Sequence, residues 1–228
     1  LALAAGISVR LEPSPLVAPR GESVALIRVA DRMRKALAQR LAEHIGADIL
    51  LEKPQDNPFL ERFYQDPQRH AMSTQLFFLF QRINEVRDQA QMDQFNTRTV
   101  SDYLFEKDAL FARLNLSEDE FKLYQQIYHG LAPQAPTPDL VIYLQASTDT
   151  LIERVKRRGR NYERSVTDDY LARLGNSYGE FFHQYEDAPL MMVNSENLNF
   201  VDNDDDFKLL LQRIEGMRGP REFFSLGV

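Results

Sequence analysis

The sequence predicts an α/β fold, a three-layer sandwich in which a central five-stranded parallel sheet carries helices on both faces. Three observations support this prediction. Short apolar, β-branched segments alternate with longer segments of helical periodicity. The intervals between the apolar segments are too long for hairpins, so right-handed crossovers between parallel strands are expected. The chain has 228 residues, of which 43% are hydrophobic, and this is enough for one domain with a substantial core.

The predicted strands are short apolar runs that end in a polar residue or a turn. The clearest is the run from Asp139 to Gln145, DLVIYLQ, which reads as a strand covered on both faces. The other four predicted strands cover residues 23–29, 47–51, 98–102 and 189–193.

The predicted helices follow the 3.6-residue period of apolar side chains. Ser117 with Glu120 has the spacing of a capping box, Ser147 or Thr148 can cap the helix after the fourth strand, and Gly159 suits its left-handed end. Residues 194–206 are predicted to form an acidic loop, and residues 1–22 an irregular segment before a single domain over 23–228. The remaining helices are predicted over residues 31–45, 57–65, 72–91, 103–114, 116–129, 166–185 and 207–217.

Composition excludes several classes of protein. The net charge of −7 argues against a general nucleic-acid binder. The absence of cysteine excludes disulfides and thiolate metal sites, and it fits a cytoplasmic protein. No apolar run approaches the roughly 20 residues of a membrane span, so no membrane partner is expected. We interpret the first eight residues, which are apolar, as a trimmed start and not as a signal peptide.

Three groups of polar residues stand out against this background. Arg154, Arg157, Arg158 and Arg160 surround the end of the helix after the fourth strand, where they either suit the negative helix terminus or clamp a polyphosphate. Glu52 follows the second strand, at the edge where α/β sheets bind ligands, although an ordinary loop glutamate would look the same. Gln75, Arg82 and Glu85 share one helix face, which is either the solvent side or a pocket wall.

With these residues in view, the chain resembles the deoxynucleoside kinases of the P-loop, thymidine kinase-like fold. The resemblance runs from about Leu37 to about Ile214 and is strongest in ILLEKPQDNPFLERFYQD and YLQASTDTLIERVKRRGRNYE. It implies ATP-dependent phosphorylation of the 5′-hydroxyl of a deoxynucleoside, as in nucleotide salvage, with Mg²⁺ as cofactor. It also implies a homodimer in the cytoplasm, with no nucleic-acid partner.

The resemblance further implies a role for each matching residue. Glu52 matches the general base, and Asp102 matches an acidic position that contacts magnesium. Tyr64 and Glu163 match the pair that holds the 3′-hydroxyl, while Gln75, Arg82 and Asp108 match the polar groups of the base pocket. The arginines of the lid, at about residues 154–165, match Arg154, Arg158 and Arg160, and the loop that wraps the adenine of ATP matches residues 204–207, including Asp206 and Phe207.

Two departures from the family pattern concern the phosphate site. The family carries an arginine directly after the acidic position, whereas this chain reads Asp102-Tyr103-Leu104. The family also begins with a glycine-rich phosphate loop, which should lie at about residues 31–36, but no glycine occurs between Gly21 and Gly46. Back-translation of residues 30–36 can read Pro-Ile-Gly-Cys-Gly-Lys in a neighbouring frame, so we hypothesise a local frame disturbance. The nucleotides of codons 20–37 test it.

Two alternative functions remain. The missing loop and arginine favour a family member that binds a nucleoside or a partner without transferring phosphate. A nucleoside monophosphate kinase would share the sheet and the lid, but Tyr64 with Glu163 favours a bare sugar as the acceptor.

Overall fold

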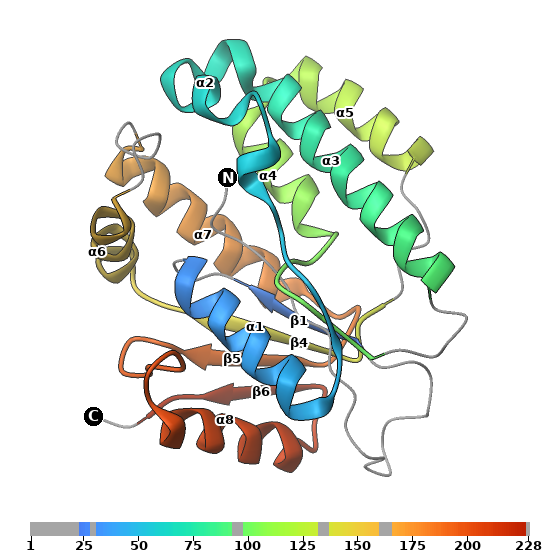
Figure 1. Ribbon diagram of the computed structural model, residues 1–228. Helices are drawn as coiled ribbons and strands as arrows, with labels where there is room; N and C mark the ends of the chain where they lie inside the picture. Colours follow the sequence, from blue (N-terminus) through green and yellow to red (C-terminus); the bar gives the residue numbers. More distant parts are fainter. Residues whose placement is uncertain (1–22, 28–30, 93–97, 132–136, 160–165, 227–228) are drawn as a thin grey trace.

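The computed structural model describes residues 23–27, 31–92, 98–131, 137–159 and 166–226. Its strands form one parallel sheet in the order β2-β3-β1-β4-β5-β6 (Figure 1). Register is set by pairs such as Asp48 with Thr99 and Val141 with Leu190. The strands are β1 (Ser23–Ile27), β2 (Asp48–Leu50), β3 (Thr99–Ser101), β4 (Leu140–Gln145), β5 (Leu190–Asn194) and β6 (Arg221–Phe224).

The prediction of an α/β fold with parallel strands is confirmed, but the predicted number of five strands was wrong. The sixth strand, β6, pairs with β5 at the edge of the sheet. It is only four residues long and shows no clear apolar alternation. Its place in the sheet is decided by pairing with β5 and not by a sequence pattern of its own.

The helices alternate with the strands, as predicted. They are α1 (Asp31–Ile45), the short 3₁₀ turn η1 (Pro54–Asp56), α2 (Leu60–Gln65), α3 (Pro67–Met92), α4 (Lys107–Asn115), α5 (Glu118–Leu131), α6 (Thr148–Arg158), α7 (Asp168–Gln184) and α8 (Asp204–Gly216). Among the described residues, no helix combines the length and the apolar character that a membrane crossing requires.

Local signals explain several helix ends. Ser147 caps α6 by accepting the backbone N–H of Thr150, and Gly159 ends this helix in the left-handed conformation with φ of 66°. Glu120 accepts the backbone N–H of Ser117 at 3.0 Å, as the capping box requires. These predicted caps are confirmed.

The predicted start of the last helix was wrong. Helix α8 begins at Asp204, inside the segment predicted as a loop, because Asn203 caps it and accepts the backbone N–H groups of Asp205 and Asp206. Three aspartates in the first turn suit the positive end of the helix dipole, so the acidity of this segment marks a helix start.

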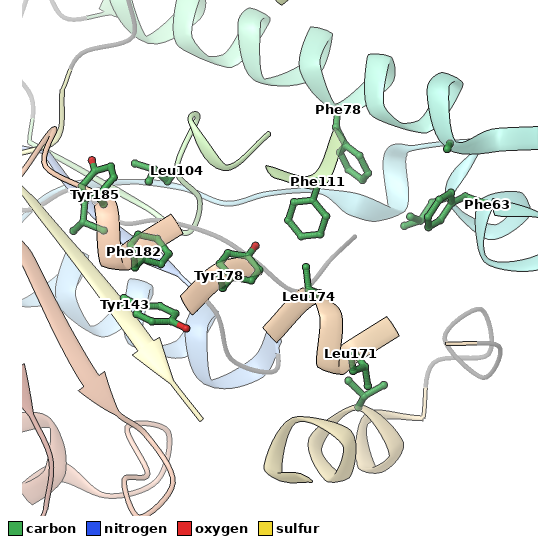
Figure 2. Packing of buried hydrophobic residues seen from close by; sticks show 14 of the residues in the cluster. Phe63, Phe78, Leu104, Phe111, Tyr143, Leu171, Leu174, Tyr178, Phe182 and Tyr185 are labelled. Atoms are coloured by element: carbon green, nitrogen blue, oxygen red, sulfur yellow. The ribbon is translucent and has the colours of Figure 1, made fainter. Parts of the chain in front are cut away.

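Strand β4 contributes to the core on both faces of the sheet, because successive side chains of a strand point to opposite faces. Leu140, Ile142 and Leu144 pack with α1 and α8 on one face. Val141 and Tyr143 face a larger cluster formed with helices α2, α3, α4 and α7, in which the Tyr143 and Phe182 rings stack at 4.4 Å (Figure 2). The sheet therefore lies between two helical layers, and the carboxyl ends of its strands share one edge.

Candidate active site

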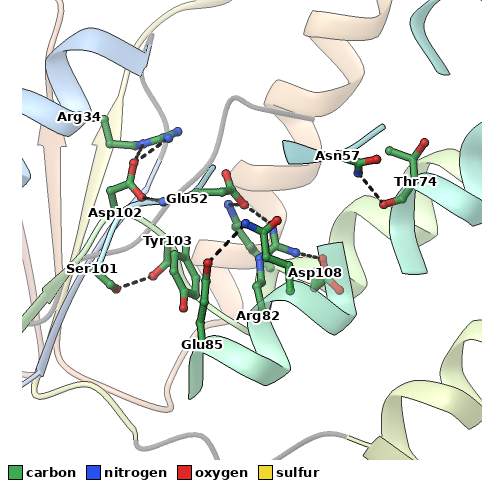
Figure 3. A network of polar contacts seen from close by, with 12 residues as sticks. Arg34, Glu52, Asn57, Thr74, Arg82, Glu85, Ser101, Asp102, Tyr103 and Asp108 are labelled. Carbon is green, nitrogen blue, oxygen red and sulfur yellow. Dashed lines mark hydrogen bonds and ion pairs between the residues drawn. The ribbon is translucent and has the colours of Figure 1, made fainter. Parts of the chain in front are cut away.

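Glu52 lies two residues beyond the end of β2, at the carboxyl edge of the sheet, and only 2% of it is exposed. Its backbone N–H donates to Oδ1 of Asp102, which follows the neighbouring strand β3, at 2.5 Å (Figure 3). Because β2 and β3 are parallel neighbours, both acidic residues arrive at one place, as their positions after predicted strands indicated.

Two buried cations contact the same oxygen of the Glu52 carboxylate. Arg82 of α3 donates to Oε1, and the ammonium of Lys107, the first residue of α4, lies 3.4 Å from it. The other oxygen, Oε2, is buried and has no hydrogen-bond partner within the described part of the chain. A buried carboxylate oxygen without a donor is costly, so Oε2 is a position where a ligand hydroxyl would be stabilised.

The surrounding charges keep Glu52 ionised. Burial alone would raise the pKa of the Glu52 carboxyl, but Lys107, Arg82 and Arg34 outweigh burial and lower this pKa to about 2. The group is therefore a carboxylate at neutral pH, and it can accept a proton from a hydroxyl bound at Oε2.

Arg82 links Glu52 to a second carboxylate, Asp108. Its guanidinium donates to Oδ1 of Asp108, whose Oδ2 accepts the Tyr124 hydroxyl at 2.6 Å. Burial by itself would lower the pKa of Arg82, but Asp108 and Glu52 raise it. Arg82 and Asp108, both predicted to line the nucleobase pocket, are thus brought together. Arg82 also contacts Glu52, the predicted general base.

Gln75 lies two turns before Arg82 on α3, is fully buried, and has no hydrogen-bond partner for either atom of its amide in the described structure. Such an amide can donate to and accept from a ligand at once. Asn57 donates to the carbonyl of Thr74 at 3.1 Å, which holds the segment after Glu52 against α3. Tyr64 is buried on α2, which follows this segment.

The lid arginines are described only in part. Arg154 is buried and donates to Oγ of Ser195 at 3.2 Å and to the Ser195 carbonyl at 2.7 Å. These donors anchor α6 to the segment after β5, and the phosphate contact of Arg154 stays a prediction. The side chain of Arg158, together with Arg160 and Glu163, lies outside the described residues.

The carboxylate of Asp102, which the resemblance matches to a magnesium contact, has protein partners on both of its oxygens. Oδ2 of Asp102 accepts both Nε of Arg34, at 3.1 Å, and Nη2, at 2.8 Å, while Oδ1 accepts the Glu52 N–H. Both side chains of this ion pair are fully buried. Over the described ranges, no group of three or more His, Asp or Glu side chains is placed to hold a metal ion.

The two residues predicted to contact the adenine have other partners. Oδ2 of Asp206 accepts the backbone N–H of Asn199 at 2.7 Å. Phe207 is 7% exposed and packs between α1 and α8, with the Arg40 guanidinium 4.3 Å from its ring centroid. Phe207 is thus a core residue, because α8 begins early enough to turn it inward.

Two functional residues escaped the sequence prediction, Arg34 and Lys107. Arg34 showed no signal, since its partner Asp102 lies 68 positions away. Lys107 showed no local signal either, since it lies in the charged run from Glu106 to Asp108. Each became recognisable only through its contacts.

A parallel sheet, an ionised carboxylate at its carboxyl edge and an unpartnered amide on the adjoining helix define a class of protein, the α/β proteins that bind a small polar ligand at that edge. The comparisons then show the family. The family profile described as "Deoxynucleoside kinase" matches residues 34–217, so the chain belongs to the deoxynucleoside kinase family, whose members are transferases that phosphorylate deoxynucleosides.

Curated relatives agree with this assignment. A deoxyadenosine kinase of Lactobacillus acidophilus is 32% identical over 80% of this chain and 89% of its own length. A deoxyguanosine kinase of Bacillus subtilis is 29% identical over 80% of this chain and 90% of its own. Among solved structures, the deoxyadenosine kinase from M. mycoides with bound dCTP has the same fold, with a TM-score of 0.70, 23% identity and coverage of 83% of this chain and 96% of that one.

Proposed function

We propose that the protein transfers the γ-phosphate of ATP to the 5′-hydroxyl of a deoxynucleoside, with Glu52 as the general base. The observation that carries the proposal is the asymmetry of the Glu52 carboxylate, where Oε1 is held by two cations and Oε2 is buried without a partner. ATP, the second substrate, donates its γ-phosphoryl group, and ADP leaves as the bond between the γ-phosphorus and the bridging oxygen breaks. Glu52 accepts the hydroxyl proton at Oε2 while the hydroxyl oxygen attacks.

Gln75 and the Arg82–Asp108 pair are proposed to bind the base. Gln75 has both amide atoms available in a buried position, and Asp108 holds Arg82 in place. Tyr64, with Glu163, is proposed to bind the 3′-hydroxyl. Because relatives include kinases named for deoxyadenosine and deoxyguanosine, we propose purine deoxynucleosides as the first substrates to test.

The remaining parts of the proposal rest on the family resemblance. Residues 23–228 would form one kinase domain whose lid covers about residues 154–165, with Arg158 and Arg160 facing phosphate. The protein would act in the cytoplasm as a homodimer.

The test is ATP-dependent phosphorylation of a panel of deoxynucleosides by the wild-type chain and by Glu52→Gln, with magnesium present. We expect the substitution to lower kcat by roughly a hundredfold or more, because the amide cannot accept the proton. The affinity for the nucleoside, measured by calorimetry, should stay within about threefold. An equal loss of affinity and rate would contradict the role as base.

A second candidate function is nucleoside binding without phosphate transfer. It is favoured by the engagement of Asp102 with Arg34 and by a helix without glycine at residues 31–36. Measurable nucleoside binding with no turnover on any acceptor would select it. Phosphorylation of a deoxynucleoside monophosphate in the same assay would instead select the third candidate, a nucleoside monophosphate kinase.

A further inference from the structure

Lys107 occupies a position that is unfavourable for a cation. It is fully buried, and it is the first residue of α4, where the helix dipole presents its positive end. Burial lowers the pKa of the Lys107 ammonium to about 7; Arg82 and Arg34 act in the same direction, while Glu52 and Asp102 act against the shift. The ring of Phe111, one turn further along α4, lies 5.9 Å from Nζ. Stability alone gives little reason for a lysine here.

The contacts of Lys107 show what it does to Glu52. Nζ lies 3.4 Å from Oε1, the oxygen that Arg82 also contacts. Arg82 directs Nη1 to Asp108 and Nη2 to Glu52, so it offers Glu52 a single donor nitrogen. A carboxylate held by one donor can turn about that contact, whereas a second cation on the same oxygen restricts the turn.

We propose that Lys107 is a positioning residue for the general base: it fixes Oε1 of Glu52, so that Oε2 alone faces the substrate hydroxyl. This inference rests on the proposed function. Lys107 touches Glu52 and not the substrate, and it acts by holding the proton-accepting lone pair of Oε2 in one direction.

The other charged groups around the pair are already engaged with partners of their own. Arg34 is held by Asp102, and Arg82 is held by Asp108, which also accepts from Tyr124. These groups come from α1, α3, α4, α5 and the segment after β3. Among the described residues, Glu52 is the carboxylate with which Lys107 forms an ion pair, at 3.4 Å.

The test combines Lys107→Met and Lys107→Arg with Glu52→Gln in a double-mutant cycle. We expect Lys107→Met to lower kcat by roughly tenfold to a hundredfold while the nucleoside Kd changes by less than about threefold. Lys107→Arg should restore part of the rate, because a guanidinium can still donate to Oε1. In the Glu52→Gln background, Lys107→Met should cause little further loss, since Lys107 acts through Glu52.

A matched control separates positioning from general destabilisation. Ile142→Val loosens the apolar core cluster that β4 forms with α1 and α8, which includes none of the charged side chains around Glu52. It should lower the urea midpoint and leave kcat within about twofold. If Lys107→Met reduces kcat only as far as it reduces the folded fraction, or if its effect adds fully to that of Glu52→Gln, the proposal is overturned.

A crystal structure of Lys107→Gln provides a readout that does not depend on turnover. We expect the Glu52 carboxylate to turn, or to occupy two orientations, while Arg82 keeps its contact with Asp108. A Glu52 carboxylate unchanged from the wild type would overturn the proposal even if the wild-type chain proves to be an active kinase. Failure of the proposed function would instead appear as a wild-type chain without turnover.

Discussion

The backbone N–H of Glu52 donates to the side chain of Asp102 at 2.5 Å, so the residue after β3 holds the backbone of the candidate base after β2. Asp102 is itself held by Arg34 of α1. The acidic position that resembles a magnesium contact therefore has a structural task in this chain, which is to join two strand ends and a helix.

Asp102→Ala should be strongly destabilising. It leaves the guanidinium of Arg34 buried without its partner, and breaking a buried pair in this way costs about 3–5 kcal/mol. Urea denaturation followed by circular dichroism measures the change. The control is Glu118→Ala, which removes the exposed pair with Arg113 and should leave the urea midpoint nearly unchanged. Similar midpoints for the two variants would contradict the structural task of Asp102.

Gln75→Met should separate stability from binding. The Gln75 amide is buried and neither atom has a partner, so an apolar side chain of similar size removes a desolvation cost of about 1–3 kcal/mol per group. We expect the free energy of unfolding to stay equal or to rise. The Kd for a deoxynucleoside, measured by calorimetry, should weaken at least about tenfold, because a site left without its hydrogen-bonding partner discriminates strongly. Unchanged affinity would remove Gln75 from the base pocket.

Glu52 should make stability depend on pH below about 5. Its pKa is about 2 in the folded protein and 4.5 without the fold, so its contribution to stability is present above 4.5 and is lost as the pH falls towards 2. The shift corresponds to roughly 3 kcal/mol. The free energy of unfolding of the wild type and of Glu52→Gln is measured by denaturation between pH 6 and about pH 2. As the pH falls, the wild type should lose more stability than Glu52→Gln does. A pH-independent difference would contradict the shift.

Arg154→Lys should loosen the attachment of α6 to β5. A lysine presents a single ammonium in place of the two separated guanidinium nitrogens with which Arg154 contacts Oγ and the carbonyl of Ser195, so it matches this pair of acceptors less well. We expect a loss of roughly 1–3 kcal/mol in the free energy of unfolding. The KM for ATP is measured alongside. A raised KM at unchanged stability would mean that Arg154 serves phosphate, as the family resemblance implies, and not the anchor.

The fold was largely predictable because its signals are local. Buried strand patterns such as DLVIYLQ and the caps Ser147 and Gly159 act over a few residues, and they were confirmed. The failures have local causes as well. Strand β6 has little pattern of its own, and the acidic start of α8 was interpreted as a loop although Asn203 caps it.

The candidate site was predictable only in part. Glu52, Gln75 and Arg82 could be named because two sit at a recognisable helix spacing and one follows a buried strand. The contacts Arg34–Asp102 and Lys107–Glu52 join residues 68 and 55 positions apart, and no local pattern encodes them.

By itself, the sequence determined the alternation of strands and helices, and with it the edge of the sheet where a carboxylate would meet a ligand, because both follow from short-range periodicity and parallel crossovers. Tertiary structure alone decided which oxygen of Glu52 is held and which is left open. That choice depends on cations from α3 and α4 arriving at one buried point, and the free energy of a buried charge is set by its neighbours in space and not by its neighbours in the chain.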